Sequence, residues 1–495
     1  MKKFKLSENI NSNKVFIINR LELGGRLDPH FYKKEYNIIK EKLSLIPTSS
    51  IRNESVKIFS GITPLSGGDA YTDKDNGIPF VRSGDFSEDN IIDFNNLNFI
   101  KPEIHNKLMK GSKILRNDLL IAIVGATIGK VGVYNYDFEA NINQAICGVR
   151  FKENINPHFI HIFFLTDLGQ KILDRIKRPV ARANINLEEV GSIPIPLLDI
   201  ITQKKIVSYF YNKIIQKQQK EAEAQRLLDS IDDYLLGELG ITLPKKEEFL
   251  PQNTDKNSSY NLDNDNPLVK KGRLFLTNLS EVTGKRWNSD YYKKYYSTFM
   301  QKIHNKYNSI LLGDIVECIF QGIGKKEMSY SNVKLLKVKN ILKNNEIDYK
   351  NIDFQLKVPK DKILKIDDII TPFIGEAIKL IKFSNHTNNK EIYSIDNNTG
   401  VIRINKFNNS KYICEYLNSS ISAIQINRLI GGGGVPFMGG NNFKKILICL
   451  PPLEKQNEIA AHISKIRSKA NVLMQEGKEI LEQAKQEVEQ MILGD

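Results

Sequence analysis

Two halves of this 495-residue chain carry the same succession of sequence patterns, and this internal repeat constrains the fold more than any other feature. Residues 117–125, an acidic turn followed by an apolar run and a glycine, align without gaps with residues 367–375. Self-similarity over so long a distance is typical of duplicated domains. The sequence therefore predicts two domains of similar architecture, each with a buried strand in this segment.

Two further pairs of segments extend the repeat toward the start of each half. Residues 26–34 and 286–294 both contain an arginine, an apolar residue, Asp or Asn, aromatic residues and a Lys-Lys pair. Residues 80–86 and 335–341 both combine an apolar strand pattern with a basic and polar end. The shared order predicts that the second half repeats most of the first.

Each half closes with a proline-containing connector. Residues 193–197 read Ile-Pro-Ile-Pro-Leu, and residues 449–453 read Cys-Leu-Pro-Pro-Leu. Proline lacks a backbone donor and restricts the residue before it, so both segments should be extended. A long helical pattern follows each connector.

Apolar residues at alternating four-three spacing predict that these two helices share a seam with a partner helix. The predicted seam positions are Val207, Phe210, Ile214, Leu228, Ile231, Leu235, Ile459, Ile463, Ile466, Ala470, Leu473 and Ile480, and the pattern continues to Met491. Lys217 and Glu221 interrupt the first seam. Helices of some 30 residues would be roughly 45 to 50 Å long and would form an antiparallel rod that holds two domains apart. The alternative is ordinary bundle core.

The predicted fold class is α+β, with two pseudo-repeated domains joined by two long antiparallel coiled-coil-like helices. Residues 240–272 are rich in Pro, Asn, Asp, Ser and Lys and are predicted to form a linker. The predicted order is a first domain at 1–200, a helix at 201–239, the linker at 240–272, a second domain at 273–453 and a second helix at 454–495.

The chain is basic, with 71 Lys and Arg against 57 Asp and Glu, a formal net charge of +14. The basic residues are spread over both halves, which favours a folded surface that binds a polyanion such as nucleic acid. The four cysteines include no Cys-x-x-Cys pair. No signal peptide or membrane-spanning run is recognisable, so a cytoplasmic location without membrane contact is expected.

The second connector carries a family resemblance. Pro451-Pro452-Leu453, followed by Gln456 and Ile459, resembles the Pro-Pro-Leu-x-x-Gln-x-x-Ile turn into the helix of specificity subunits from type I restriction-modification systems. The first connector has the same turn with three extra residues before Gln203. In the order of its parts the resemblance covers almost the whole chain.

The resemblance implies a DNA-binding subunit in which each domain is a target-recognition domain for one part of a split target. It also implies partners: double-stranded DNA, modification subunits that methylate adenine, and restriction subunits. The cofactors S-adenosylmethionine, ATP and magnesium are then expected on those partner subunits, and none is expected on this chain.

A search of the residues for catalysis agrees with a non-catalytic subunit. An adenine methyltransferase needs an Asn/Asp-Pro-Pro-aromatic loop, and the sequence has none. Residues 125–130 are one residue short of a phosphate-binding loop, and Val131 replaces its hydroxyl residue. His158 and His161 lack a third ligand, so no metal site is predicted. Two alternatives stay open: a single-chain nuclease or methyltransferase with a divergent site, and a structural adaptor without sequence preference.

Candidate DNA-binding residues are side chains that donate to or accept from base edges, or that hold phosphate, near turns and glycines. The basic segment 174–186 is the first candidate, and the glycine-rich segment 428–442 is its counterpart in the repeat. The predicted set is Arg82, Ser83, Asp85, Lys130, Arg175, Lys177, Arg178, Arg182, Asn184, Asn186, Lys337, Lys339, Asn340, Lys379, Arg428, Gly432, Gly433 and Asn441.

Overall fold

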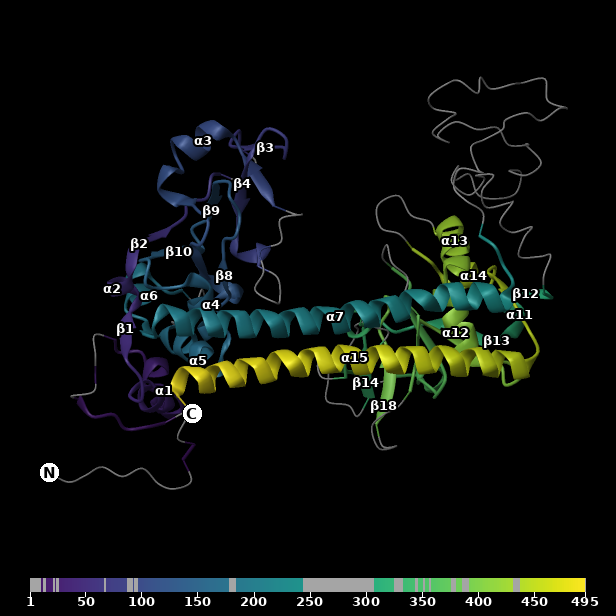
Figure 1. The fold of residues 1–495 in the computed structure, drawn as a ribbon. Helices are drawn as coiled ribbons and strands as arrows, with labels where there is room; N and C mark the ends of the chain where they lie inside the picture. The colour runs from purple at the N-terminus through teal and green to yellow at the C-terminus, as the bar shows by residue number, and fades with distance from the viewer. Residues whose placement is uncertain are drawn as a thin grey trace, which may run out of the picture. The chain divides into compact units, whose positions relative to one another are not determined.

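A computed structural model describes residues 10–243 and 307–494 of the chain (Figure 1). The gaps within these ranges are residues 12–14, 21–22, 24–25, 66–67, 87–91, 93–96, 178–183, 325–332, 343–345, 350–351, 356–357, 375–379, 385–390 and 431–436. The chain divides into two compact units, unit 1 with residues 1–222 and 473–495, and unit 2 with residues 223–472.

Unit 1 is built on a four-stranded antiparallel sheet with two helices packed on it. The strand order is β2 (Ser55–Ser60), β10 (Ile146–Phe151), β7 (Leu119–Ala122) and β8 (Val131–Val133). Helices α4 (Pro157–Leu165) and α5 (Asp167–Ile176) follow β10. Phe159 and Phe163 of α4 join Leu119 and Val149 of the sheet in one buried core. This core also takes in Phe210, near the start of the first long helix.

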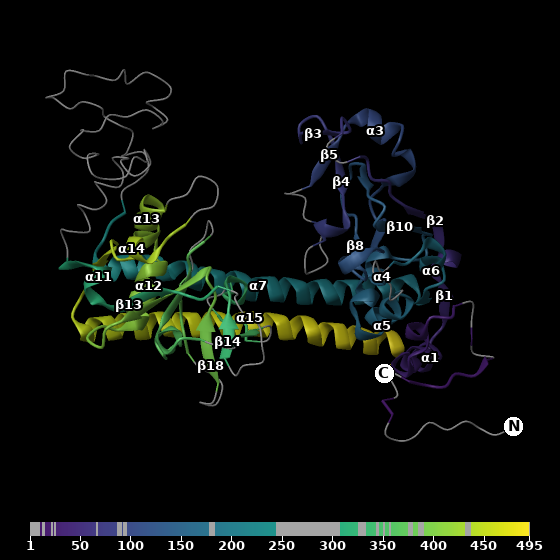
Figure 2. The same ribbon diagram turned by 180° about the vertical axis from the view of Figure 1, so that it is seen from behind.

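A second sheet of unit 1 has five strands and lies farther from the long helix than α4 and α5 do (Figure 2). Its order is β3 (Tyr71–Thr72), β5 (Asn98–Ile100), β4 (Ile78–Val81), β9 (Ala140–Ile142) and β6 (Lys113–Ile114), with β4 and β9 parallel. Strands β1 (Thr48–Ser50) and β11 (Pro194–Pro196) form a separate pair. The short helices are α1 (Asn37–Leu43), α2 (Ile51–Glu54), α3 (Pro102–Asn106) and α6 (Leu187–Gly191).

Unit 2 repeats this topology, which confirms the predicted repeat and the α+β class. Its four-stranded sheet has the order β13 (Val316–Gln321), β19 (Thr399–Ile404), β16 (Ile369–Pro372) and β17 (Ile381–Lys382). A second sheet has the order β15 (Asp353–Gln355), β14 (Val333–Leu336) and β18 (Ile392–Ile395), and β14 and β18 are again parallel. Strands β12 (Ser309–Leu311) and β20 (Leu447–Cys449) pair as β1 and β11 do, and the helices are α11 (Leu312–Ile315), α12 (Ser410–Asn418), α13 (Ser420–Leu429) and α14 (Gly440–Phe443).

The two predicted long helices are present as α7 (Ile200–Leu239) and α15 (Leu453–Leu493). Within each unit they run antiparallel. In unit 1 the Nζ of Lys220 lies 2.8 Å from a carboxylate oxygen of Glu476. In unit 2 the rings of Tyr234 and His462 stack with centroids 4.2 Å apart.

Apart from Met491, all of the predicted seam residues are at least half-buried in the structure. Phe210, Ile231, Leu235, Ile459, Ile463, Ala470 and Leu473 are buried, and Val207, Ile214, Leu228, Ile466 and Ile480 are half-buried. The expectation for Met491 is wrong, because Met491 is 44% exposed and Ile492 is buried instead. A straight helix of 3.6 residues per turn drifts away from a 3.5-residue repeat, so the last turns present the next position. Lys217, an interruption in the pattern, is itself buried and pairs with Glu221 at 3.2 Å.

The domain boundaries need one correction, since both compact units cut through the long helices. The predicted organisation sets each helix apart as a spacer, whereas the start of α7 and the end of α15 belong to unit 1, and the remainder of both belongs to unit 2. Most of the predicted linker at 240–272, and the repeat segment 286–294, lie outside the described residues. In the part of the chain that the structure describes, every helix is too short or too polar to cross a membrane.

Candidate nucleic-acid surfaces

In unit 1, predicted residues that are distant in sequence meet beyond the end of β7. Lys130 donates through Nζ to the Phe86 carbonyl at 2.8 Å, just after the turn that begins at Arg82. Asn184 forms a β-bridge with Val124. Lys177 is adjacent to Gly129, because a Cβ atom on that glycine would lie 3.8 Å from the lysine Nζ. We call Arg82, Lys130, Lys177 and Asn184 the β7-end surface.

In the turn at residues 82–86, Asp85, which is a predicted DNA-binding residue, has a structural role. The Asp85 carboxylate accepts from the Arg82 backbone N–H at 2.8 Å and pairs with the Arg82 guanidinium at 3.0 Å. In unit 2, Asn340 likewise accepts from the Lys337 backbone N–H at 3.0 Å and donates to the Asp348 carbonyl at 3.1 Å.

Asn340 is 1% exposed and its side chain bonds within its own turn, so the structure gives this predicted DNA-binding residue a structural role. The same holds for Asp85, whose side chain is 9% exposed and closes its own turn. Ser83 is half-buried and Lys339 is exposed in these two turns. A short polar side chain in a turn can hydrogen-bond to the backbone of that turn or to the edge of a base. The sequence pattern does not distinguish these two roles.

Two members of the basic segment 174–186 also hold the fold together. Arg175 lies over the Phe31 ring, 4.1 Å from its centroid, and donates to the Phe31 carbonyl at 3.1 Å. Burial lowers the pKa of Arg175. Asn186 caps α6 by accepting from the Glu189 N–H at 2.8 Å. Both residues are therefore anchors, whereas Arg178 and Arg182 lie outside the described residues.

Unit 2 has a groove of about 370 Å³ at the position equivalent to the β7-end surface. Beyond β16, Phe437 forms an isolated β-bridge with Ile374, and Asn184 forms the equivalent β-bridge with Val124 in unit 1. We call this the β16-end groove, and it is lined by Ile319, Phe320, Gln321, Phe373, Phe437, Gly439, Gly440, Asn441, Asn442 and Lys444.

Of the residues predicted in this part of unit 2, Asn441 lines the groove and is exposed. Arg428 lies in the last turn of α13 and is half-buried. Lys379, Gly432 and Gly433 lie outside the described residues. Gln321, Phe437 and Lys444 also line the groove and were not predicted from the sequence. The sequence carried a usable signal for Phe437, because an aromatic residue between two runs of glycine is unusual for a core position.

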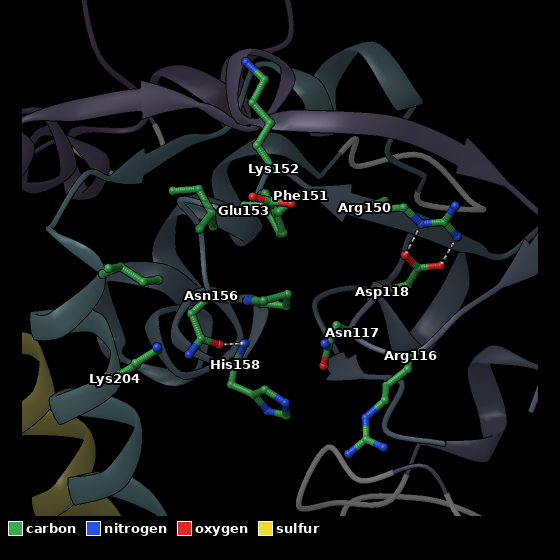
Figure 3. Close-up of a pocket in the computed structure, with 13 residues that line it drawn as sticks. Arg116, Asn117, Asp118, Arg150, Phe151, Lys152, Glu153, Asn156, His158 and Lys204 are labelled. Carbon is green, nitrogen blue, oxygen red and sulfur yellow. Dashed lines mark hydrogen bonds and ion pairs between the residues drawn. The ribbon is translucent and has the colours of Figure 1, made fainter. Parts of the chain in front are cut away.

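A second cleft, of about 540 Å³, lies in unit 1 near the start of β7 (Figure 3). Its clearest feature is the ion pair in which Arg150 donates to Asp118 at 2.8 and 2.7 Å. Hydrogen bonding to Asp118 raises the pKa of Arg150. Arg403 and Asp368 form the same pair in unit 2, at 2.7 and 2.8 Å. A pair kept in both copies is a structural element, so this cleft is not our candidate recognition surface.

His158 and His161, the His-x-x-His pair of the sequence, both lie in buried surroundings that lower their pKa values. Burial, followed by the charge of Arg116, lowers the pKa of His158, whose Nδ1 lies 2.7 Å from the Tyr211 hydroxyl. Burial lowers the pKa of His161 to about 4. Among the described residues, no group of three His, Cys, Asp or Glu side chains is arranged to hold a metal ion.

Comparison with known proteins finds sequence similarity in the first half of the chain. Residues 56–227 match the family model of the type I restriction modification DNA specificity domain. The type I restriction enzyme EcoBI specificity subunit of Escherichia coli is 32% identical over 212 residues, which are 41% of this chain and 44% of that protein. The match thus spans less than half the length of this curated relative.

Two solved structures are similar over most of their length. One is a chain from a type I R-M system studied for complex assembly and conformational transition, with a TM-score of 0.44, 12% identity, and coverage of 90% of this chain and 96% of that chain. The other is the S subunit of a type I restriction-modification system from M. genitalium, with a TM-score of 0.38, 10% identity, and coverage of 90% and 95%. By sequence, the similarity of this chain to the type I restriction modification DNA specificity domain covers residues 56–227.

Proposed function

We propose that this chain is the sequence-specific DNA-binding specificity subunit of a type I restriction-modification complex. Each unit reads one part of a split target in double-stranded DNA. Modification subunits bound to the chain methylate adenine at that target, and restriction subunits cleave DNA. The match of residues 56–227 to the family model and the net charge of +14 support this proposal.

The observation that carries the proposal is that the two units share a framework but differ at their exposed surfaces. The Asp118–Arg150 pair recurs as Asp368–Arg403 with the same geometry. At the equivalent surface positions the chemistry changes, since Asn184 corresponds to Phe437. Two copies that read two different sequences need a common framework and different groups at the base edges.

The chain itself is proposed to be non-catalytic. The sequence lacks the loop with which an adenine methyltransferase holds its flipped base. S-adenosylmethionine, ATP and magnesium are accordingly assigned to the partner subunits, and this chain is proposed to bind none of them.

The test is selection from a random duplex library at moderate salt, with the full chain alone and with its co-purified modification partner. Enrichment of one split motif supports the proposal, and sequencing the retained fragments also gives the spacing. Methylation or cleavage by the isolated chain would identify a single-chain enzyme instead. Retention of DNA without any enriched motif would identify a structural adaptor with incidental charge.

A further inference from the structure

We propose that the β16-end groove reads an A·T base pair within the half-site bound by unit 2. Asn441 recognises the adenine edge, and Phe437 contacts the thymine methyl group. The inference rests on the proposed function and adds to it the residues and the base pair at one position.

The groove combines an apolar floor with polar groups that are free to bind. Phe373 is 2% exposed and lies edge-on to Phe437, with ring centroids 6.4 Å apart. Phe437 itself is 42% exposed. The side chain of Asn441 is exposed and has no hydrogen-bond partner among the described residues. Both the Phe437 ring and the Asn441 amide are therefore accessible to a ligand.

The floor is also held in place before any ligand binds. The Phe320 ring, part of the lining, has Lys362 Nζ 4.8 Å and the Arg403 guanidinium 5.6 Å from its centroid. Arg403 is fixed in turn by Asp368. A rigid floor lets the rim select between bases without the cost of ordering the site on binding.

Glycine at two positions keeps the groove open. A Cβ atom on Gly440 would lie 2.9 Å from Ile319 Cγ2, and one on Gly439 would lie 3.0 Å from Phe437 Cε1. Gly439 is the N-cap of α14, the role that Asn186 has for α6 in unit 1. Counting on from these caps, Gly440 corresponds to Leu187 and Asn441 to Glu188. Unit 1 thus has a larger residue and a carboxylate where unit 2 has a glycine and an amide.

This chemistry fits an A·T pair better than a G·C pair. In the major groove adenine presents an acceptor at N7 and a donor at N6, and an asparagine amide satisfies both at once. Thymine adds a methyl group, for which an exposed phenylalanine is a suitable apolar contact, and a G·C pair has no methyl group. Lys444, on the same rim, carries the charge to hold a neighbouring phosphate.

The experiment repeats the library selection with the full-length variants Asn441→Ala and Asn441→Asp. The aspartate keeps the shape but removes the donor that adenine N7 requires. We expect both variants to lose the preference at one A·T position of the unit 2 half-site, with affinity for the wild-type target falling about 5- to 150-fold. The other half of the motif should not change. The matched control is Glu188→Ala, the counterpart in unit 1, which should leave the unit 2 half-site intact.

The contact between Phe437 and the thymine methyl group is tested by changing the base in the DNA target. Replacing thymine by uracil at that position removes only the methyl group and should weaken wild-type binding about fourfold, the value of one buried methyl group. In Phe437→Ala the same replacement should have no further effect. Circular dichroism establishes that each variant is folded.

The failures of the two proposals are distinguishable. A wild-type chain that enriches no motif overturns the proposed function and this inference together. A wild-type motif that Asn441→Ala and Asn441→Asp leave unchanged, or a loss of preference at a G·C pair, overturns the inference alone.

Discussion

At the scale of single residues, the Asp–Arg pairs predict unequal stability losses in the two units. Asp368 and its partner Arg403 have side chains 1% and 10% exposed, while Arg150, the partner of Asp118, is 31% exposed. Asp368→Ala leaves a nearly buried guanidinium without its counter-charge, and we expect a loss of about 3 to 5 kcal/mol in unfolding free energy. Asp118→Ala should cost less, because water reaches Arg150.

Urea unfolding at pH 7 measures both losses. Glu482→Ala, which removes an exposed partner of Lys485, is the control and should cost under about 1 kcal/mol. Equal losses for Asp368→Ala and Asp118→Ala would show that burial of the arginine does not set the cost.

His161 predicts a pH dependence of stability. Its Nε2 is buried and is without a hydrogen-bond partner in the described part of the chain. Burial, with a smaller contribution from His158, lowers the pKa of His161 from 6.5 to about 4. The unfolded chain therefore binds the extra proton first, so stability is complete above pH 6.5 and falls between pH 6.5 and 4, by roughly 3 kcal/mol from this group.

The comparison of wild type with His161→Phe isolates this contribution from the carboxylates that titrate in the same range. Unfolding free energies at pH 7 and pH 4.5 should differ by less in the variant than in the wild type. An identical difference in both proteins would mean that His161 is not buried in its neutral form.

At the scale of elements, one glutamine ties the start of each long helix to a shorter one. Gln203 accepts from the Asn156 N–H at 2.7 Å and donates to the Leu198 carbonyl at 2.8 Å. Gln456 accepts from the Asn409 N–H at 2.9 Å and donates to the Pro451 carbonyl at 2.9 Å. The motif that suggested the family is thus a joint between helices.

Replacing either glutamine leaves partly buried backbone groups unpaired. We expect Gln203→Ala and Gln456→Ala each to lower the unfolding free energy by about 1 to 3 kcal/mol. The control is Gln475→Ala on the exposed face of α15, where a change within about 0.5 kcal/mol is expected. Losses no greater than that of the control, measured in urea, would contradict the role of the glutamines as joints.

How much the sequence predicts also depends on the element. The repeat, the connectors and the long helices are visible because they follow from spacing and proline chemistry. The structure confirms the connectors, the long helices and the repeated segments that lie within the described residues. The recognition surface is harder to predict, because Asn340 and Asn441 have the same chemistry in the sequence. Only folding shows that Asn340 closes a turn, whereas Asn441 is exposed on a groove.

At the scale of the whole molecule, the net charge of +14 predicts strongly salt-dependent DNA binding. A protein with 6 to 10 phosphate contacts loses about 10³- to 10⁵-fold in affinity between 50 and 200 mM salt. If Lys444 holds a phosphate, Lys444→Gln should reduce the slope of log affinity against log salt by about 1. Lys445→Gln changes the neighbouring exposed lysine, which is not part of the groove lining, and should leave the slope unchanged in the same titration.

The division of the long helices between the units has a consequence for how the chain can be cut. The core of unit 1 includes Ala484, Val488 and Ile492 from the end of the chain, and the core of unit 2 includes Ile231 and Leu235 from its first half. A break between residues 243 and 307 would give two fragments, each carrying apolar residues that belong in the other's interior. The halves repeat each other in sequence, yet each compact unit draws its core from both halves.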